Sequence, residues 1–341
     1  MTSIDHVARS IGVSTATVSR ALRGLPGVSA DTRTRVLAAA EELGYVPSSS
    51  ASGLASGRTM AMGVLLPLIE RWYFSAVLEG VDRQLRAAGY DLVVFSLGGT
   101  GVNRERVFHR SILRKRIDAL LVMCMELTDD ELQSLHAMES PTIVVGGSVR
   151  GVRHVGIDDD AAARDAVEHL ISLGHTNIAH LRGGGSYGIE FEVPRIREEA
   201  YLGAMAAHGL LVRPEWSLFG DFRFKQGKEA AMTLLQDPTD RPTAVFCSSD
   251  EMAFGVITAA AELGISIPEQ LSVVGIDDHE FAEPMNLTTI RQRPEEQGAY
   301  ATDLLLAELE GAPPLAVPTP RPHELIIRNS TAPPGGRVRG R

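Results

Sequence analysis

Long apolar runs are missing from this sequence. No stretch approaches the ~18 consecutive apolar residues that a membrane-spanning helix needs, although 44% of the 341 residues are hydrophobic. The first residues, MTSIDHVARSIGVS, carry acidic and polar side chains where a secretory signal peptide has its apolar core. These absences argue against a membrane protein and against an exported one. We therefore expect a cytoplasmic protein of two or three domains.

Cysteine is also scarce. The two cysteines, Cys124 and Cys247, lie in apolar, strand-like runs, so we expect buried and inert thiols. No Cys/His spacing is typical of a metal site, and His175 with His180 is too sparse a pair to form one. The sequence therefore predicts neither a metal nor a cofactor.

Basic residues are outnumbered over the whole chain, which has a net charge of −10 and by that number alone would repel nucleic acid. The charge is unevenly distributed, however. Residues 1–59 contain six arginines and four acidic residues, a net charge of +2, whereas the remainder carries −12. A mildly basic segment joined to an acidic body indicates two parts with separate functions.

The first 46 residues predict three short helices and no strand. Ser3, Ser14 and Ser29 can each cap a helix, and a glycine ends the third helix. A tight turn separates the first two helices, so the segment fits a helix-turn-helix. Residues 47–59, PSSSASGLASGRT, have the composition of a flexible linker.

The second helix, TATVSRAL, would enter the major groove of DNA, because recognition helices place their N-terminal residues against base edges. Thr15 and Ala16 suit thymine methyl groups, and Arg20 can fork onto O6 and N7 of a guanine. Hydroxyls and backbone N–H groups at the helix start can bind phosphates. The alternative is an ordinary three-helix domain with capping serines. The candidate DNA-binding residues here are Ser14, Thr15, Ala16, Thr17, Ser19 and Arg20.

From residue 60 onward, strand-like runs alternate with amphipathic helices. This alternation predicts parallel sheets with helices on both faces, and about 270 residues of such units exceed one domain. We therefore expect an α/β body of two lobes, each built on a doubly wound parallel sheet. The final residues, 331–341, have the composition of a disordered tail. The expected strands begin near residues 62, 91, 117, 142, 177, 243 and 272, and the expected helices include 75–88, 161–173 and 251–263.

Acidic residues follow four strand-like runs, at the strand ends where doubly wound sheets bind ligands. Carboxylates accept hydrogen bonds from vicinal hydroxyls, and aromatic faces stack on the C–H face of a pyranose. The aromatic residues of RWYF, 71–74, and Phe222 supply such faces, so the pattern favours a sugar site. For any single aspartate, capping of the next helix is the alternative. The acidic positions are Asp158, Asp159, Asp221, Asp250, Asp277 and Asp278.

The segment SIDHVARSIGVSTATVSRALRGLPGVSADTRTRVLAAAEELGYVP resembles the DNA-binding head of the LacI/GalR family of bacterial transcription regulators. The likeness continues through ISLGHTNIAHL, SSDEMAFGVITAAAELGISIPEQLSVVGIDD and LTTIRQ, and it covers about residues 3–330. It implies an all-α helix-turn-helix head and a two-lobed, periplasmic-binding-protein-like α/β body. The implied boundaries are 1–46 for the head, 47–59 for the hinge, 60–159 plus 292–322 for the N-lobe, and 160–291 plus 323–330 for the C-lobe.

The resemblance also gives the linker a role. In that family the hinge folds on operator DNA, and a leucine from each of two chains wedges into the minor groove, a role that Leu54 matches. Ser48 and Ser52 stand where many members have Asn and Arg, and Gly53 precedes the leucine. Glycine inside a helix costs ~1 kcal/mol relative to alanine, so we expect a weakly ordered hinge helix and weaker operator binding than in relatives.

For the effector site, the resemblance selects particular residues. Arg197 matches the ligand-binding arginine of the family's R-x-x-G-aromatic pattern, although Ala200 replaces the glycine here. Asp250 and Asp277 match acidic positions that contact effector, and Phe222 matches an aromatic that stacks on it. Asp159 is an alternative to Asp158. The effector-binding candidates are Tyr73, Phe74, Asp158, Arg197, Phe222, Asp250 and Asp277.

The resemblance implies a homodimer, or a tetramer, that aligns two heads on double-stranded, pseudo-palindromic operator DNA. We expect a repressor of carbohydrate uptake or utilisation genes, associated with the nucleoid and released when a small neutral sugar shifts the lobes. A purine or nucleoside effector and a corepressor mechanism are the alternatives. The resemblance implies no membrane partner.

One motif suggests an enzyme instead. Within HLRGGGSYG, residues 184–188 spell G-x-S-x-G, the nucleophile elbow of serine hydrolases. An elbow leads directly into a helix, whereas Pro194 delays the next helix, and a hydrolase has no evident use for the head. We therefore interpret Gly183, Gly184 and Gly185 as a loop whose backbone approaches an effector hydroxyl or the opposing lobe, with Ser186 as a polar contact. A sugar-binding transport protein is excluded by the head and the missing signal sequence, and a ligand-independent DNA architectural protein is a further alternative.

Overall fold

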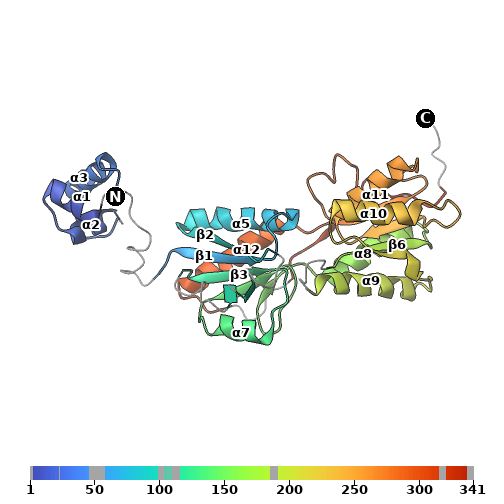
Figure 1. The fold of residues 1–341 in the computed structure, drawn as a ribbon, viewed down its shortest axis with the longest axis horizontal. Helices are drawn as coiled ribbons and strands as arrows, with labels where there is room; N and C mark the ends of the chain where they lie inside the picture. The colour runs from blue at the N-terminus through green and yellow to red at the C-terminus, as the bar shows by residue number, and fades with distance from the viewer. Residues whose placement is uncertain are drawn as a thin grey trace. The chain divides into compact units, whose positions relative to one another are not determined.

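The chain divides into two compact units, Met1–Met60 and Ala61–Arg341, in a computed structural model (Figure 1). The structure describes residues 3–22, 24–45, 58–98, 104–105, 107–108, 116–184, 191–314 and 320–335. Leu54 and nearly all of the expected linker lie outside these residues. Among the helices that are described, none is both long and apolar enough to cross a membrane.

Among the residues described in the first unit, three helices form: α1 (Ile4–Ile11), α2 (Thr15–Leu22) and α3 (Ala30–Glu42). The caps are those that the sequence predicts: Ser14 Oγ accepts from the Thr17 N–H at 3.1 Å, and Ser29 Oγ accepts from the Thr32 N–H at 3.2 Å. One buried valine from each helix, together with small alanines, forms the core. The predicted helix-turn-helix arrangement is therefore confirmed.

The second unit is built on two sheets (Figure 1). The first has the order β2-β1-β3-β4-β5 and the second β11-β10-β9-β8-β6-β7. Within the described residues, every pairing is parallel except that of β10 with β11. The strands are β1 (Ala61–Leu66), β2 (Asp91–Ser96), β3 (Ala119–Met123), β4 (Thr142–Val145), β5 (His154–Val155), β6 (Ile178–Arg182), β7 (Ser217–Phe219), β8 (Ala244–Cys247), β9 (Ser272–Asp277), β10 (Thr288–Arg291) and β11 (Glu324–Ile326).

Helices cover both sheets and define two lobes. Although α12 comes late in the chain, it packs on α5 and contacts β3 and β4, so it belongs to the N-lobe (Figure 1). The N-lobe helices are α5 (Trp72–Ala88), α7 (Asp129–His136) and α12 (Pro294–Leu309). The C-lobe helices are α8 (Asp159–Ser172), α9 (Val193–Ala207), α10 (Phe224–Leu235), α11 (Asp250–Glu262) and the short 3-10 helix η1 (Pro214–Trp216).

Helices α5 and α12 approach each other closely enough for backbone to meet backbone. A Cβ atom on Gly80 of α5 would lie 1.9 Å from the carbonyl oxygen of Glu295, and a Cβ on Gly298 of α12 would lie 2.2 Å from the carbonyl oxygen of Val77. Only glycine fits at these two positions. The two helices are therefore packed backbone to backbone at both positions.

The expected disordered tail is wrong for its first residues. The Ser330 carbonyl accepts from the Val273 N–H at 2.8 Å, and the Ala332 N–H donates to Ser272 Oγ at 3.0 Å. His175 is buried, and its Nε2 lies 2.9 Å from the Ala332 carbonyl oxygen. These contacts fix the chain beside β9. They could not be predicted from the residues, because Thr-Ala-Pro-Pro is typical of loops.

Candidate functional site

The head presents one face of α2 to solvent. Thr15, Ala16 and Arg20 are exposed, as a residue that contacts base edges must be. Ser14 and Thr17 are joined through their hydroxyls at 2.9 Å and form the cap of the helix. Ser19 is half-buried. The structure thus separates the outward-facing candidates from those that also stabilise the helix start.

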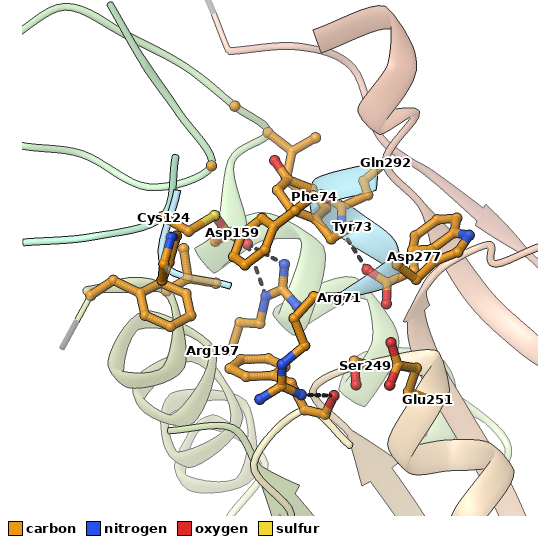
Figure 2. A pocket seen from close by; sticks show the side chains of 18 of the residues that line it. Arg71, Tyr73, Phe74, Cys124, Asp159, Arg197, Ser249, Glu251, Asp277 and Gln292 are labelled. Carbon is orange, nitrogen blue, oxygen red and sulfur yellow. Dashed lines mark hydrogen bonds and ion pairs between the residues drawn. The ribbon is translucent and has the colours of Figure 1, made fainter. Parts of the chain in front are cut away.

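A cavity lies between the two lobes of the body, and side chains from both lobes line it (Figure 2). Five of its residues are aromatic, which gives it apolar faces beside its charged groups. Two arginines face four acidic residues, so the wall has no excess of positive charge. The aromatic residues are Trp72, Tyr73, Phe74, Phe191 and Phe222, and the charged ones are Arg71, Arg197, Asp159, Asp221, Glu251 and Asp277.

Five of the seven effector-binding candidates line this cavity: Tyr73, Phe74, Arg197, Phe222 and Asp277. The structure brings them together from four separate elements, at the strand ends and helix starts where doubly wound sheets bind ligands. The other two candidates, Asp158 and Asp250, do not line it.

The cavity is lined by Asp159 and not by Asp158, the residue that was selected as the candidate. Asp158 is exposed, and its Oδ1 accepts from the Ala161 N–H at 3.0 Å, which makes it the N-cap of α8. Asp159 instead lines the cavity, where its Oδ1 accepts from Arg197 Nη2 at 2.7 Å and from Nε at 2.9 Å (Figure 2). The carboxylate of this pair that can reach a ligand is therefore Asp159.

Asp250 is a buried partner of the cavity rather than part of its wall. Its side chain is 0% exposed, Oδ2 accepts from the His279 N–H at 2.9 Å, and the Thr289 hydroxyl lies 2.6 Å from Oδ1. Burial, and then the charge of Asp277, raise the pKa of Asp250 well above its ordinary value. These contacts leave Asp250 to hold the turn after β9 instead of touching a ligand.

Arg197 is fixed by groups of its own lobe. Besides Asp159, it donates to the Ser248 carbonyl through Nη1 at 2.6 Å. Burial opposes its charge, but Asp159 and Asp277 outweigh that effect, and the pKa of Arg197 lies above its ordinary value. The hydrogen bonds among the described residues use three of the five guanidinium N–H groups. Two remain to meet a ligand hydroxyl.

Asp277, at the end of β9 in the C-lobe, is a hydrogen-bond acceptor in the cavity wall. Its Oδ1 accepts from Gln292 Nε2 at 2.5 Å. Burial raises its pKa to about 7, while the charge of Arg197 and the Gln292 hydrogen bond act in the other direction. An ionised Asp277 accepts hydrogen bonds from hydroxyl groups, as a sugar site requires.

Arg71 joins the lobes and was not predicted. It lies at the start of α5 and donates from Nη1 to the Phe222 carbonyl at 2.7 Å, with Nη2 3.6 Å from Asp221 (Figure 2). Beside it, the rings of Trp72 and His279 lie 4.6 Å apart across the lobe boundary. The segment RWYF, residues 71–74, suggests a sugar site through its aromatic residues. Its arginine, Arg71, is the feature from which a contact between the lobes could have been predicted. Glu251, Gln292 and Gln297 were also missed, because single polar residues at helix starts resemble caps.

The glycines of HLRGGGSYG have a packing role. A Cβ on Gly183 would lie 2.0 Å from the Phe222 ring, and one on Gly184 would lie 2.4 Å from the Phe219 ring. These rings belong to the glycines' own lobe. Gly184 also lines the cavity between the lobes, so the approach of this loop to an effector stays a prediction. Gly185 and Ser186 lie outside the described residues.

Neither cysteine has the properties of a nucleophile or a metal ligand. Both are buried and free, as predicted. Cys124 lies at the cavity wall, where burial raises the pKa of its thiol far above the ordinary value. Among the described residues, no group of three or more His, Cys, Asp or Glu side chains could hold a metal ion.

Two family models match the chain. Residues 3–48 match the model of bacterial regulatory proteins of the lacI family, and residues 167–331 match that of the periplasmic binding protein-like domain. Catabolite control protein A of Priestia megaterium is 32% identical over 96% of this chain and 99% of its own length. The HTH-type transcriptional repressor PurR of Serratia proteamaculans is 36% identical over 90% of each chain.

Solved structures give the same picture. The Lac repressor dimer bound to operator and the anti-inducer ONPF has a TM-score of 0.83 and 27% identity, and the match covers 97% of this chain and 99% of that one. A complex of the transcriptional regulator CelR with cellobiose has a TM-score of 0.70 and 27% identity, with 97% and 100% covered.

Proposed function

This chain belongs to the LacI family of bacterial regulatory proteins, which are DNA-binding transcriptional regulators rather than enzymes, and from that premise we propose its specific activity. It is a repressor of carbohydrate uptake or utilisation genes that binds a pseudo-palindromic operator as a dimer and is released by a neutral sugar. We assign DNA contact to residues 1–46, the hinge to 47–59 and effector binding to 60–330. Acting on operator DNA, the dimer associates with the nucleoid.

The observation that carries the sugar assignment is the composition of the cavity wall. Five aromatic rings offer apolar faces, while Asp159, Asp277 and Arg197 offer acceptors and donors for vicinal hydroxyls. With two arginines against four acidic residues, a sugar phosphate would meet net repulsion. The relative CelR is described as a cellobiose complex, which supports a neutral sugar.

A purine or nucleoside is the second candidate effector. The tilted rings of Phe191 and Phe222, with centroids 5.8 Å apart, supply a face on which a planar base can stack. Calorimetry on the full chain with glucose, cellobiose, maltose, hypoxanthine and adenosine separates the two classes. Binding of a sugar that also releases operator DNA in a mobility-shift titration supports the proposal. Binding of only the bases, or tighter operator binding with any ligand, contradicts it.

Arg20→Ala should reduce affinity for the operator by about 5- to 150-fold, because a bidentate contact to guanine contributes about 1–3 kcal/mol of base discrimination. The operator is first selected from random duplexes with the wild-type dimer, and affinities are then measured at fixed salt. Arg9→Ala on α1 is the matched control, since Arg9 is also exposed and, among the described residues, its side chain donates to the Asp5 carbonyl of its own helix. Equal weakening of selected and random DNA by Arg20→Ala would show that Arg20 contacts phosphate and reads no base.

A further inference from the structure

A chain of hydrogen bonds runs from the C-lobe wall of the cavity to the first turn of α5 in the N-lobe. Gln292 Nε2 donates to Asp277 Oδ1 at 2.5 Å, and Gln297 Nε2 donates to the Gln292 carbonyl at 2.7 Å. The Tyr73 hydroxyl then donates to Gln297 Oε1 at 3.0 Å. Gln292 and Gln297 are 4% and 1% exposed, so solvent does not compete for these bonds. All four residues line the cavity, and Figure 2 shows Tyr73, Gln292 and Asp277 within it.

The chemistry of the groups fixes the direction of the chain. A backbone carbonyl can only accept, so the amide of Gln297 must present its NH₂ group to Gln292 and its oxygen to Tyr73. Tyr73 must therefore donate. Every bond in the series then donates toward the carboxylate of Asp277. The bond from Gln292 favours the ionised form of Asp277, and the bonds from Tyr73 and Gln297 hold Gln292 in place.

Both ends of the chain are held rigidly. At the Tyr73 end, a Cβ on Gly146 would lie 2.6 Å from the tyrosine hydroxyl, so only glycine leaves room for that oxygen. Gln297 precedes Gly298, whose backbone packs directly on α5. Near the Asp277 end, Arg293 takes a left-handed backbone conformation with φ of 50°, which turns the polypeptide sharply between β10 and α12. Gln292 is therefore linked through Gln297 to the closely packed α5–α12 pair.

We propose that Gln292 and Gln297 are positioning residues that connect Asp277 to α5, so that a ligand bonded to Asp277 changes the contact between the lobes. This inference rests on the proposed function, in which Asp277 binds the effector. Neither glutamine was a candidate in the sequence, and their role is to transmit, since Asp277 accepts the ligand hydroxyl. The N-lobe is also the lobe that continues through residues 46–60 to the head.

A change of pH can test this connection, because Asp277 titrates near neutral pH and protonation changes its charge without any ligand. Protonation removes the negative charge at the end of the chain and weakens the bond from Gln292. The groups that face Asp277 are Asp250 and Glu251 of α11, Arg197 of α9 and Tyr73 of α5. The pKa of His279, which contacts Trp72, is lowered from 6.5 by burial, so it titrates in a more acidic range.

The experiment reads the lobe contact through Trp72. The chain has two tryptophans, so Trp216→Phe leaves Trp72 as the single emitter, with its ring against His279 of the other lobe. Fluorescence is followed from pH 5 to pH 9 without effector or DNA. We expect a transition near pH 7 that is absent in Asp277→Asn. Gln292→Met should move its midpoint up by about one pH unit, because a hydrogen bond to a charged group is lost.

The residues of the hydrogen-bond series farthest from Asp277, Gln297 and Tyr73, provide the decisive test. Gln297→Met and Tyr73→Phe should at least halve the amplitude of the transition, whereas Gln133→Met, at an exposed amide on α7, should leave it unchanged. A purely structural role would not move a titration. Unchanged amplitudes in both variants, or a wild-type chain without the transition, overturn the proposal. Tyr73→Phe removes one oxygen atom, so it decides the matter even if the glutamine variants fail to fold. Because no effector is used, failure here is distinct from failure of the sugar assignment.

Discussion

Replacing Gly80 with alanine is expected to lower the free energy of unfolding of the body by about 2 kcal/mol. The new Cβ would lie 1.9 Å from the Glu295 carbonyl oxygen, so α5 and α12 must separate. Overpacking of this kind costs about 1–3 kcal/mol, and this contact lies at the upper end of that range because backbone cannot yield as a flexible side chain does. The gain of ~1 kcal/mol in helix propensity offsets part of that cost. Thermal unfolding should show a midpoint about 4–8 °C lower.

Gly203→Ala is the matched control for this prediction. Gly203 also lies inside a helix, α9, but a Cβ there would have its nearest neighbour, Arg164 Nη1, at 3.7 Å. The same substitution should therefore stabilise the body, by up to ~1 kcal/mol. If the two variants shift the unfolding midpoint in the same direction, the close approach of α5 and α12 is not a constraint in solution.

Arg197→Ala is expected to abolish the effector response while operator binding persists. The substitution removes one of the two arginines of the cavity wall and leaves the Asp159 carboxylate without its partner. Breaking a buried pair in this way costs about 3–5 kcal/mol, so the loss of response must be separated from a loss of folding. Operator titrations with and without the sugar found by calorimetry measure the response, and thermal unfolding measures the stability.

The double variant Arg197→Leu with Asp159→Leu makes that separation. Removing both charges relieves the unpaired carboxylate, so stability should recover to within about 1–2 kcal/mol of wild type. The effector response should stay absent, because neither donor nor acceptor is restored. A folded double variant that still releases operator with effector would show that this ion pair is structural. Loss of operator binding in a folded variant would contradict the separation of head and body.

Local chemistry made the head predictable from its sequence. Helices α2 and α3 follow Ser14 and Ser29, whose hydroxyls accept from the backbone N–H three residues ahead, so the signal and the structure occupy the same few residues. The long strands of the body were equally clear. The short strands β10 and β11 were not predicted, because three or four residues carry too little alternation, and pairing with a neighbour decides their conformation.

A site residue was predictable where its residue type has one plausible role. It was not predictable where the residue's position along a helix decides its role. Asp158 and Asp159 are chemically identical, but one residue of offset makes the first a cap and the second a partner of Arg197. Gln292 and Gln297 have no distinctive pattern. Their role depends on the meeting of β9, α5 and α12, segments that are far apart in the sequence.

The return of α12 to the first sheet has a consequence for synthesis on the ribosome. The described helices of the head, α1 to α3, lie within residues 3–45, so this segment can fold as soon as it emerges. The N-lobe sheet is complete at β5, but α12 begins only at Pro294, and translation of the intervening residues takes on the order of 10 s. Throughout that interval the apolar surface that α12 will cover is open to solvent. The nascent chain thus carries a DNA-binding head before its body can fold. The incomplete N-lobe exposes apolar surface of the kind that chaperones bind.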